Sequence, residues 1–314
     1  MSKIDTQTRK ILFEKLKKSG KITDSSALVY VRTIVRLHKL SETKINIMKP
    51  AWLTQKLAKK IKENSQARHL FLAGVKLLQA LEIKKGKRWD LWYGFMIQSS
   101  NAYKTERGKA KLSDKEIKKI SGVTFKSFCK TVRKLIPPVR RTLTKSLDSI
   151  TLKNVLRIQD VLVLLFFCEV PLRNELANVK ISDLVKNKDN HFQKNKSGYT
   201  LILNDHKTVK NVGARRHKLT KSLARILNKF IPMVKKITDH DYLLTTARGN
   251  RMTPNSLSKY LVKITKELFP TGFSSQIIRI LFAQDKLKGL KALTDAQEAL
   301  GHADIQTTMS YAKT

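Results

Sequence analysis

The segment 151–168 constrains the fold of this chain more than any other stretch, because it is apolar on almost every side. A surface helix carries one apolar stripe, whereas a helix that is hydrophobic all round must be covered by other elements. We therefore predict that 151–168 is the central, buried helix of a domain. The longest apolar run, 161–170, is interrupted by Glu169 and is far too short to cross a bilayer, so we expect a soluble intracellular protein.

The charge of the chain is strongly unbalanced. Its 314 residues, enough for two domains, include 64 Lys and Arg against 24 Asp and Glu, giving a formal net charge of +40 and a pI near 10.3. Such a chain attracts polyanions, of which nucleic acid is the commonest. The alternative is a lysine-coated surface with no particular partner.

The two cysteines, Cys129 and Cys168, lie in apolar stretches and are expected to be reduced core thiols.

The first third of the chain has the periodicity of helices. The segment 23–40 places apolar residues on one stripe after an N-cap at Asp24 or Ser25, and Pro50 suits a first helical turn. A further apolar helix is expected at 66–81. We predict a small helical bundle over about 28–103.

A polar stretch, 104–111, follows and is typical of a linker. Ser113 and Glu116 then form a capping-box pattern that opens a short basic helix. The next helix, 124–135, is expected to stop before the prolines at 137–138. These segments either bridge two domains or belong to the second, and the pattern leaves both open.

The second half mixes strands and helices. Beta-like segments are expected at 179–184, 199–203 and 212–219, and helices at 220–230, 253–269, 274–287 and 295–300. The predicted fold is mainly α with a small antiparallel β-sheet, in two domains. We expect a helical domain at 1–103, basic bridging helices at 104–148 and an α+β domain at 149–314.

The last residues carry the sharpest motif. Leu300-Gly301-His302 is followed, nine positions after the histidine, by Tyr311, with two threonines shortly before it. This pattern resembles the signature of the tyrosine recombinase (phage-type integrase) family, in which the tyrosine is the nucleophile that attacks DNA. The motifs that carry the resemblance lie within 150–314. For 24–103 the resemblance is only to a helical DNA-clamping domain of suitable size.

The resemblance implies further residues upstream. The family's first arginine follows a buried helix, and Arg173 matches it, with the acidic Glu175 two positions later. The family's catalytic lysine lies in a β-hairpin, where Lys207 is the first candidate and Lys210 the alternative. The second arginine box usually reads His-x-x-Arg, and here Gln276 stands in place of the histidine. The implied catalytic set is Arg173, Lys207, Gln276, Arg279, His302 and Tyr311.

The chemistry of these residue types suits attack on a phosphodiester. Arg173 and Arg279 can hold the non-bridging oxygens and stabilise the charge of a pentavalent transition state. Tyrosine has a reference pKa of about 10, and a cationic pocket favours its reactive phenolate. Lys207 can protonate the leaving 5′-oxygen, and His302 can donate to a phosphate oxygen or position the nucleophile. A 3′-phosphotyrosine link conserves the bond energy, so neither ATP nor a metal cofactor is expected.

The resemblance also implies partners. Family members clamp double-stranded DNA and work as homo-tetramers on two sites, and they integrate or excise mobile elements. Assembly commonly uses a helix beyond the nucleophile, whereas these 314 residues end three positions after Tyr311. Two other functions remain open: a type IB topoisomerase, which would relax one plasmid rather than join two sites, and a basic DNA-binding protein with a degenerate site.

Overall fold

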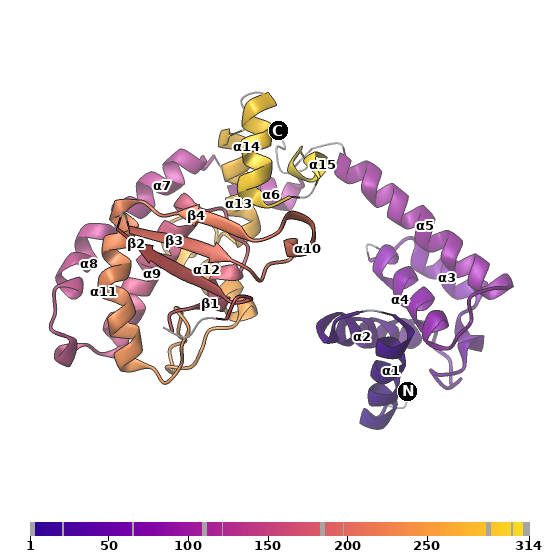
Figure 1. Ribbon diagram of the computed structural model, residues 1–314. Helices are drawn as coiled ribbons and strands as arrows, with labels where there is room; N and C mark the ends of the chain where they lie inside the picture. Colours follow the sequence, from indigo (N-terminus) through magenta and orange to yellow (C-terminus); the bar gives the residue numbers. More distant parts are fainter. Residues whose placement is uncertain are drawn as a thin grey trace. The chain divides into compact units, whose positions relative to one another are not determined.

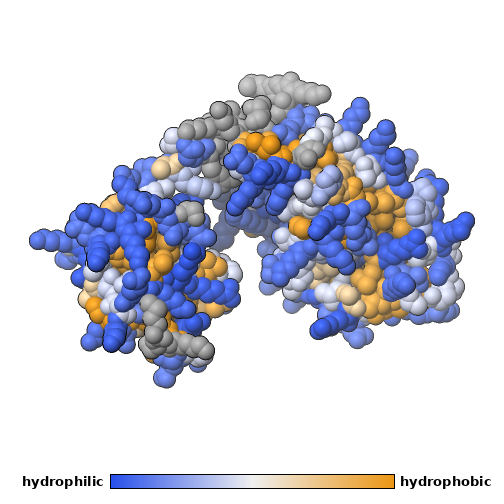
Figure 2. Space-filling view, turned by 180° about the vertical axis from the view of Figure 1, so that it is seen from behind, coloured by the Kyte–Doolittle hydropathy of each residue, from blue (hydrophilic) through white to orange (hydrophobic). Residues whose placement is uncertain are grey.

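The computed structural model divides the chain into two compact units, Met1–Gly108 and Lys109–Thr314 (Figure 1). No helix in the described part of the chain is long and apolar enough to cross a membrane. Figure 2 shows one side of the molecule, where hydrophilic side chains cover most of the surface of each unit. The structure describes residues 4–20, 22–64, 66–108, 112–120, 122–182, 186–196, 198–286, 290–302 and 304–309.

The first unit is a helical bundle built around α4, which contacts each of the other α-helices of the unit. Gly74 in α4 has no side chain, and a Cβ there would lie 2.4 Å from the indole of Trp92, so the glycine lets α4 and α5 approach closely. The elements are α1 (Thr6–Ser19), α2 (Asp24–Leu40), the 3₁₀-helix η1 (Pro50–Trp52), α3 (Gln55–Lys62), α4 (Ala67–Ala80) and α5 (Lys87–Gly108).

Three features of this unit differ from the sequence predictions. The helix α1 was not predicted. The N-cap of α2 is Thr23, whose hydroxyl accepts from the backbone N–H of Ser26, rather than Asp24 or Ser25. The helix α5 continues to Gly108, through the first five residues of the stretch predicted as a linker, because Lys104, Glu106 and Arg107 are good helix formers and no proline interrupts them.

The second unit is centred on α9 (Leu152–Glu169), as predicted. A capping box between Thr151 and Asn154 starts this helix, and ten of its residues are buried. It contacts α7 (Phe125–Arg133), α8 (Ile136–Leu143), α11 (Lys221–Ile237) and α12 (Pro254–Lys266). The segment 122–143 therefore packs within the second unit. The predicted capping box of Ser113 and Glu116 is present at the start of α6 (Asp114–Ile120).

The prolines at 137–138 begin a helix rather than merely ending one. They occupy the first turn of α8, where a missing N–H costs no hydrogen bond. The helix α11 continues through Pro232 to Ile237, beyond its predicted end.

Cys129 is buried, Cys168 is half-buried, and both are free thiols.

The sheet is mixed, which corrects the prediction of an antiparallel one. Its order is β1-β2-β3-β4, with β1 parallel to β2 and the other neighbours antiparallel. The ring of Phe192 in β2 stacks on Phe166, so the sheet lies against α9 (Figure 1). The strands are β1 (Val179–Lys180), β2 (Asn190–Asn195), β3 (Gly198–Leu203) and β4 (Arg215–Lys218).

Candidate active site

Arg279 is a fully buried arginine near the middle of α13 (Ser275–Lys286), only 1% exposed. Its Nη1 donates to the carbonyl of Pro171 at 2.6 Å, and its Nη2 donates to the carbonyl of Leu300 at 3.2 Å. The same Nη2 lies 2.8 Å from Nε2 of His302. Arg279 therefore joins the loop after α9 to the turn that carries His302.

His302 is 3% exposed and is held on both sides of its ring. Its Nε2 faces Arg279, and its Nδ1 lies 3.0 Å from the hydroxyl of Thr308 in α15 (Ile305–Met309). Burial, followed by the nearby guanidinium groups of Arg279, Arg173 and Arg215, lowers the pKa of His302 to about 3. The imidazole is thus neutral at physiological pH.

Gly301 shapes the turn before His302. It follows α14 (Leu290–Leu300) with a φ of 62°, the left-handed conformation that ends many helices and that glycine adopts without strain. The backbone N–H of His302 then bonds back to the carbonyl of Gln297 at 3.1 Å. The local sequence Leu-Gly-His therefore turns the histidine back toward α13.

Arg173 lies between α9 and the 3₁₀-helix η3 (Glu175–Asn178), with 24% of its side chain exposed. Its backbone N–H donates to Oε2 of Glu175 at 2.5 Å, and its Nη1 lies 3.9 Å from Oε1. Glu175 is itself buried. The carboxylate two positions after the arginine therefore folds back onto it, and Arg173 is the more open of the two predicted site arginines.

Lys207 is an exposed residue of the loop between β3 and β4. The next residue, Thr208, donates its hydroxyl to the carbonyl of Gly301 at 2.7 Å, which ties this loop to the His302 turn. The ring of His206 bonds the carbonyl of Gly213 at 2.9 Å and closes the base of the loop. Lys210, in the short helix α10 (Val209–Val212), is also exposed.

Gln276 is exposed in the first turn of α13, on the same helix as Arg279. Its amide Nε2 donates to Oε1 of Glu116 in α6 at 3.3 Å, while Oε2 of that glutamate caps the backbone of Ser113. An amide nitrogen has two N–H groups, so the contact leaves a donor for another acceptor.

The structure thus brings Arg173, Arg279, His302 and the loop of Lys207 to one place. Tyr311 lies outside the described residues; Thr308, three positions earlier, is the partner of His302. Sequence reasoning missed Thr208 and Arg215. Neither had a usable signal, since each resembles many other threonines or basic residues of the chain. Among the described residues no group of three His, Cys, Asp or Glu is placed to hold a metal ion.

A cavity of about 710 Å³ lies beside this cluster, between β4 and α14. Its lining includes Arg215, His217, Gly301 and His302. Burial, followed by Arg215 and His206, lowers the pKa of His217 to about 4. One side of the cavity therefore carries the Arg215 guanidinium and two neutral imidazoles, and the acidic residues Asp295 and Glu298 also line it.

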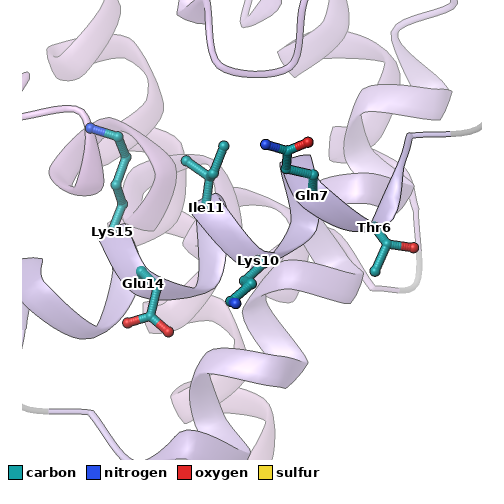
Figure 3. A pocket seen from close by; sticks show the side chains of 6 residues that line it. All are labelled: Thr6, Gln7, Lys10, Ile11, Glu14 and Lys15. Carbon is teal, nitrogen blue, oxygen red and sulfur yellow. The ribbon is translucent and has the colours of Figure 1, made fainter.

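A second hollow of similar volume lies on the surface of α1. Figure 3 shows that its six lining side chains come from this one helix, with Gln7, Ile11 and Lys15 along one ridge. A hollow lined by one helix brings together no side chains from different elements. We therefore place the site in the second unit.

The model of the phage integrase family matches residues 140–314, more than half of the chain. The protein therefore belongs to this family, that of the tyrosine recombinases. A search of curated proteins found no match.

Solved structures share the fold at low sequence identity. One is the XerH site-specific recombinase bound to palindromic difH substrate, a post-cleavage complex, with a TM-score of 0.55 and 18% identity over 96% of this chain and 80% of that one. Another is the Tn1549 transposon integrase in complex with transposon right end DNA, with a TM-score of 0.51 and 13% identity over 98% of this chain and 94% of that one.

Proposed function

We propose that this protein is a site-specific DNA recombinase that cleaves and rejoins duplex DNA through a 3′-phosphotyrosine intermediate at Tyr311. The observation that carries the proposal is the chain of contacts from Arg279 through His302 to Thr308. It couples the buried arginine of the second motif to the helix that leads to the tyrosine.

The two arginines receive different roles. Arg173, which reaches solvent, binds a non-bridging oxygen of the scissile phosphate. Arg279 supplies a buried positive charge beneath the phosphate, with its Nη2 already bonded to the Leu300 carbonyl and to His302. Both charges stabilise the pentavalent transition state and favour the phenolate of Tyr311.

Lys207 and Gln276 complete the catalytic set. The Thr208–Gly301 bond holds the Lys207 loop at the His302 turn, so the ammonium can protonate the leaving 5′-oxygen. Gln276 donates its remaining amide N–H to the phosphate but carries no proton in the reaction. His302, neutral and bonded on both sides, positions Arg279 and the Thr308 helix rather than acting as an acid.

The partner is duplex DNA, and the net charge of +40 supplies salt-dependent affinity for its backbone. The XerH and Tn1549 integrase structures are bound to a recombination substrate and to a transposon end. By analogy, we propose that the helical first unit clamps DNA while the second unit cleaves it. A homo-tetramer on two sites would then integrate or excise a mobile element.

A capture experiment with DNA of random sequence tests the proposal and selects a target at the same time. The full chain is incubated with a library of random-sequence duplexes, each nicked to trap the intermediate, in EDTA and without ATP. Covalent adducts are isolated under denaturing conditions, the bound DNA is sequenced, and the modified peptide is mapped by mass spectrometry. Modification of Tyr311 by one enriched sequence, the selected duplex, supports the proposal.

Two results would contradict it. The absence of any adduct above that of heat-denatured protein would identify a DNA-binding protein with a degenerate site. Adducts that lead only to relaxation of one supercoiled plasmid, without joining of two plasmids that carry the selected sequence, would identify a topoisomerase.

A further inference from the structure

Arg215 is a buried arginine that none of the sequence motifs includes. It is the first residue of β4 and is 7% exposed, whereas the next residue of the strand, Arg216, is exposed. Burying a guanidinium is costly unless it is paired or hydrogen-bonded. The burial of this arginine beside the candidate active site therefore needs a structural explanation.

The contacts of Arg215 are concentrated on the turn that carries His302. Its Nη2 donates to the carbonyl of Ala299, at the end of α14. A Cβ at Gly301 would lie 2.9 Å from its Nη1, so the guanidinium packs directly on the glycine backbone. Its Nε and Nη1 make no hydrogen bond with the described residues and are shielded from solvent, so a phosphate oxygen cannot reach them in this arrangement.

The charge of Arg215 also acts on the site. Burial lowers the pKa of Arg215, Glu175 opposes that shift, and Arg173 adds to it. Glu175 therefore lies within electrostatic reach of two guanidinium groups. Of the two, only Arg173 lies within ion-pair distance of Glu175, with its Nη1 3.9 Å from Oε1.

We propose that Arg215 is a positioning residue of the recombinase site: it holds the Ala299–His302 turn against β4 and so places His302 against Arg279. The proposal rests on the function proposed above. Arg215 and Thr208 then act as two clamps on the same turn, one on the Ala299 carbonyl and one on the Gly301 carbonyl. The hairpin that carries Lys207 and the turn that carries His302 are kept together by both.

The test compares Arg215→Met with Arg216→Met, two variants that remove the same charge from adjacent positions of one strand. Both should bind the selected duplex with equal affinity, within about twofold, because each loses one cation of many. Arg215→Met should slow single-turnover cleavage by about 10- to 100-fold, since a small misplacement of catalytic groups has effects of that size. Arg216→Met should cleave at the parent rate, and Arg215→Lys should recover part of the loss.

A second readout needs no DNA. The ¹⁵N signals of the His302 ring report its tautomer and its bond to Thr308, and they should change in Arg215→Met but not in Arg216→Met. This comparison stands even if the capture experiment finds no adduct, so the two proposals fail separately. If Arg215→Met lowers thermal stability, Arg215→Lys supplies the same two readouts in a folded protein.

Two results would overturn the proposal. One is identical His302 signals in Arg215→Met and Arg216→Met, which would make Arg215 a packing residue only. The other is equal cleavage rates in these two variants on the selected duplex.

Discussion

The Nη2 atom of Arg279 lies 2.8 Å from Nε2 of His302, and this contact determines which ring nitrogen carries the proton. A guanidinium only donates, so Nε2 accepts and the proton resides on Nδ1, which faces the hydroxyl of Thr308. Both sides of the ring are therefore engaged within the protein. We therefore propose that the histidine of the Leu-Gly-His motif orients its neighbours, and the following predictions test this site residue by residue.

Tyr311→Phe should abolish covalent protein–DNA adducts and leave duplex affinity nearly unchanged. Only the hydroxyl takes part in the chemistry, while the basic surface supplies the binding. Adduct formation is measured on denaturing gels with the selected duplex, and affinity by titration at fixed salt. Adducts formed at the parent level by the Phe variant would show that another residue is the nucleophile.

Lys207→Met should slow cleavage of the selected duplex by about 10²- to 10⁴-fold, the usual contribution of a general acid. A substrate with sulfur in place of the bridging 5′-oxygen needs no proton on its leaving group, so the variant should cleave it at nearly the parent rate. Lys210→Met is the matched control and should cleave both substrates normally. If the substrate with the bridging sulfur instead restores cleavage by Lys210→Met and not by Lys207→Met, the general acid is Lys210.

Gln276→Ala should slow single-turnover cleavage by roughly one to three orders of magnitude, the effect of losing one oxyanion donor. Gln276→His should be tolerated and should gain a rate that varies between about pH 6 and 8, where histidine titrates. Single-turnover cleavage rates of the parent, Gln276→Ala and Gln276→His are measured across that pH range. Parent-like cleavage by Gln276→Ala would place this side chain outside the active site.

His302 should make the protein sensitive to acid. Its folded pKa of about 3 lies below the ordinary value of 6.5, so the unfolded state binds a proton first and stability is lost as the pH falls from 6.5 toward 3. Between about pH 7.5 and 5 this one group should lower the free energy of unfolding by about 2 kcal/mol. Urea unfolding at both pH values measures it.

His302→Gln should lack this contribution, so its loss of stability over the same pH interval should be smaller by about 2 kcal/mol. An equal pH dependence in the parent and His302→Gln would mean that His302 is not held neutral by its surroundings.

Gly301→Ala should destabilise the second unit more than Gly249→Ala does. Both glycines have positive φ, 62° and 77°, so each substitution incurs about 1–2 kcal/mol of backbone strain. A Cβ at Gly249 meets nothing within 4 Å, whereas one at Gly301 meets the guanidinium of Arg215 and adds about 1–3 kcal/mol of overpacking. Urea unfolding of the two variants gives the difference, and equal losses would contradict the close packing.

Local sequence was sufficient to predict most of the helices. The apolar surface of 151–168 involves residues within one helix, so its pattern is visible without tertiary contacts. The strand β2 was missed because its residues, Asn-His-Phe-Gln-Lys-Asn, are mostly polar, and it becomes a strand through pairing with β3.

The sequence by itself determined which residues are the candidates for the site. Leu300-Gly301-His302, the spacing to Tyr311, and the arginines after α9 and in α13 are each local patterns, because turns and helix faces require particular residues at short spacing. These patterns alone were enough to indicate the family. They also identified Gln276 as a departure from the family's usual histidine.

Only the tertiary structure decided what those groups do to one another. The bonds from Arg279 to Pro171 and from Thr208 to Gly301 join residues 108 and 93 positions apart, so no local pattern records them. Arg215 could not be distinguished from the other 63 basic side chains until folding buried it against Gly301. Burial and charge proximity, which set the pKa of His302, arise only when distant segments are packed together.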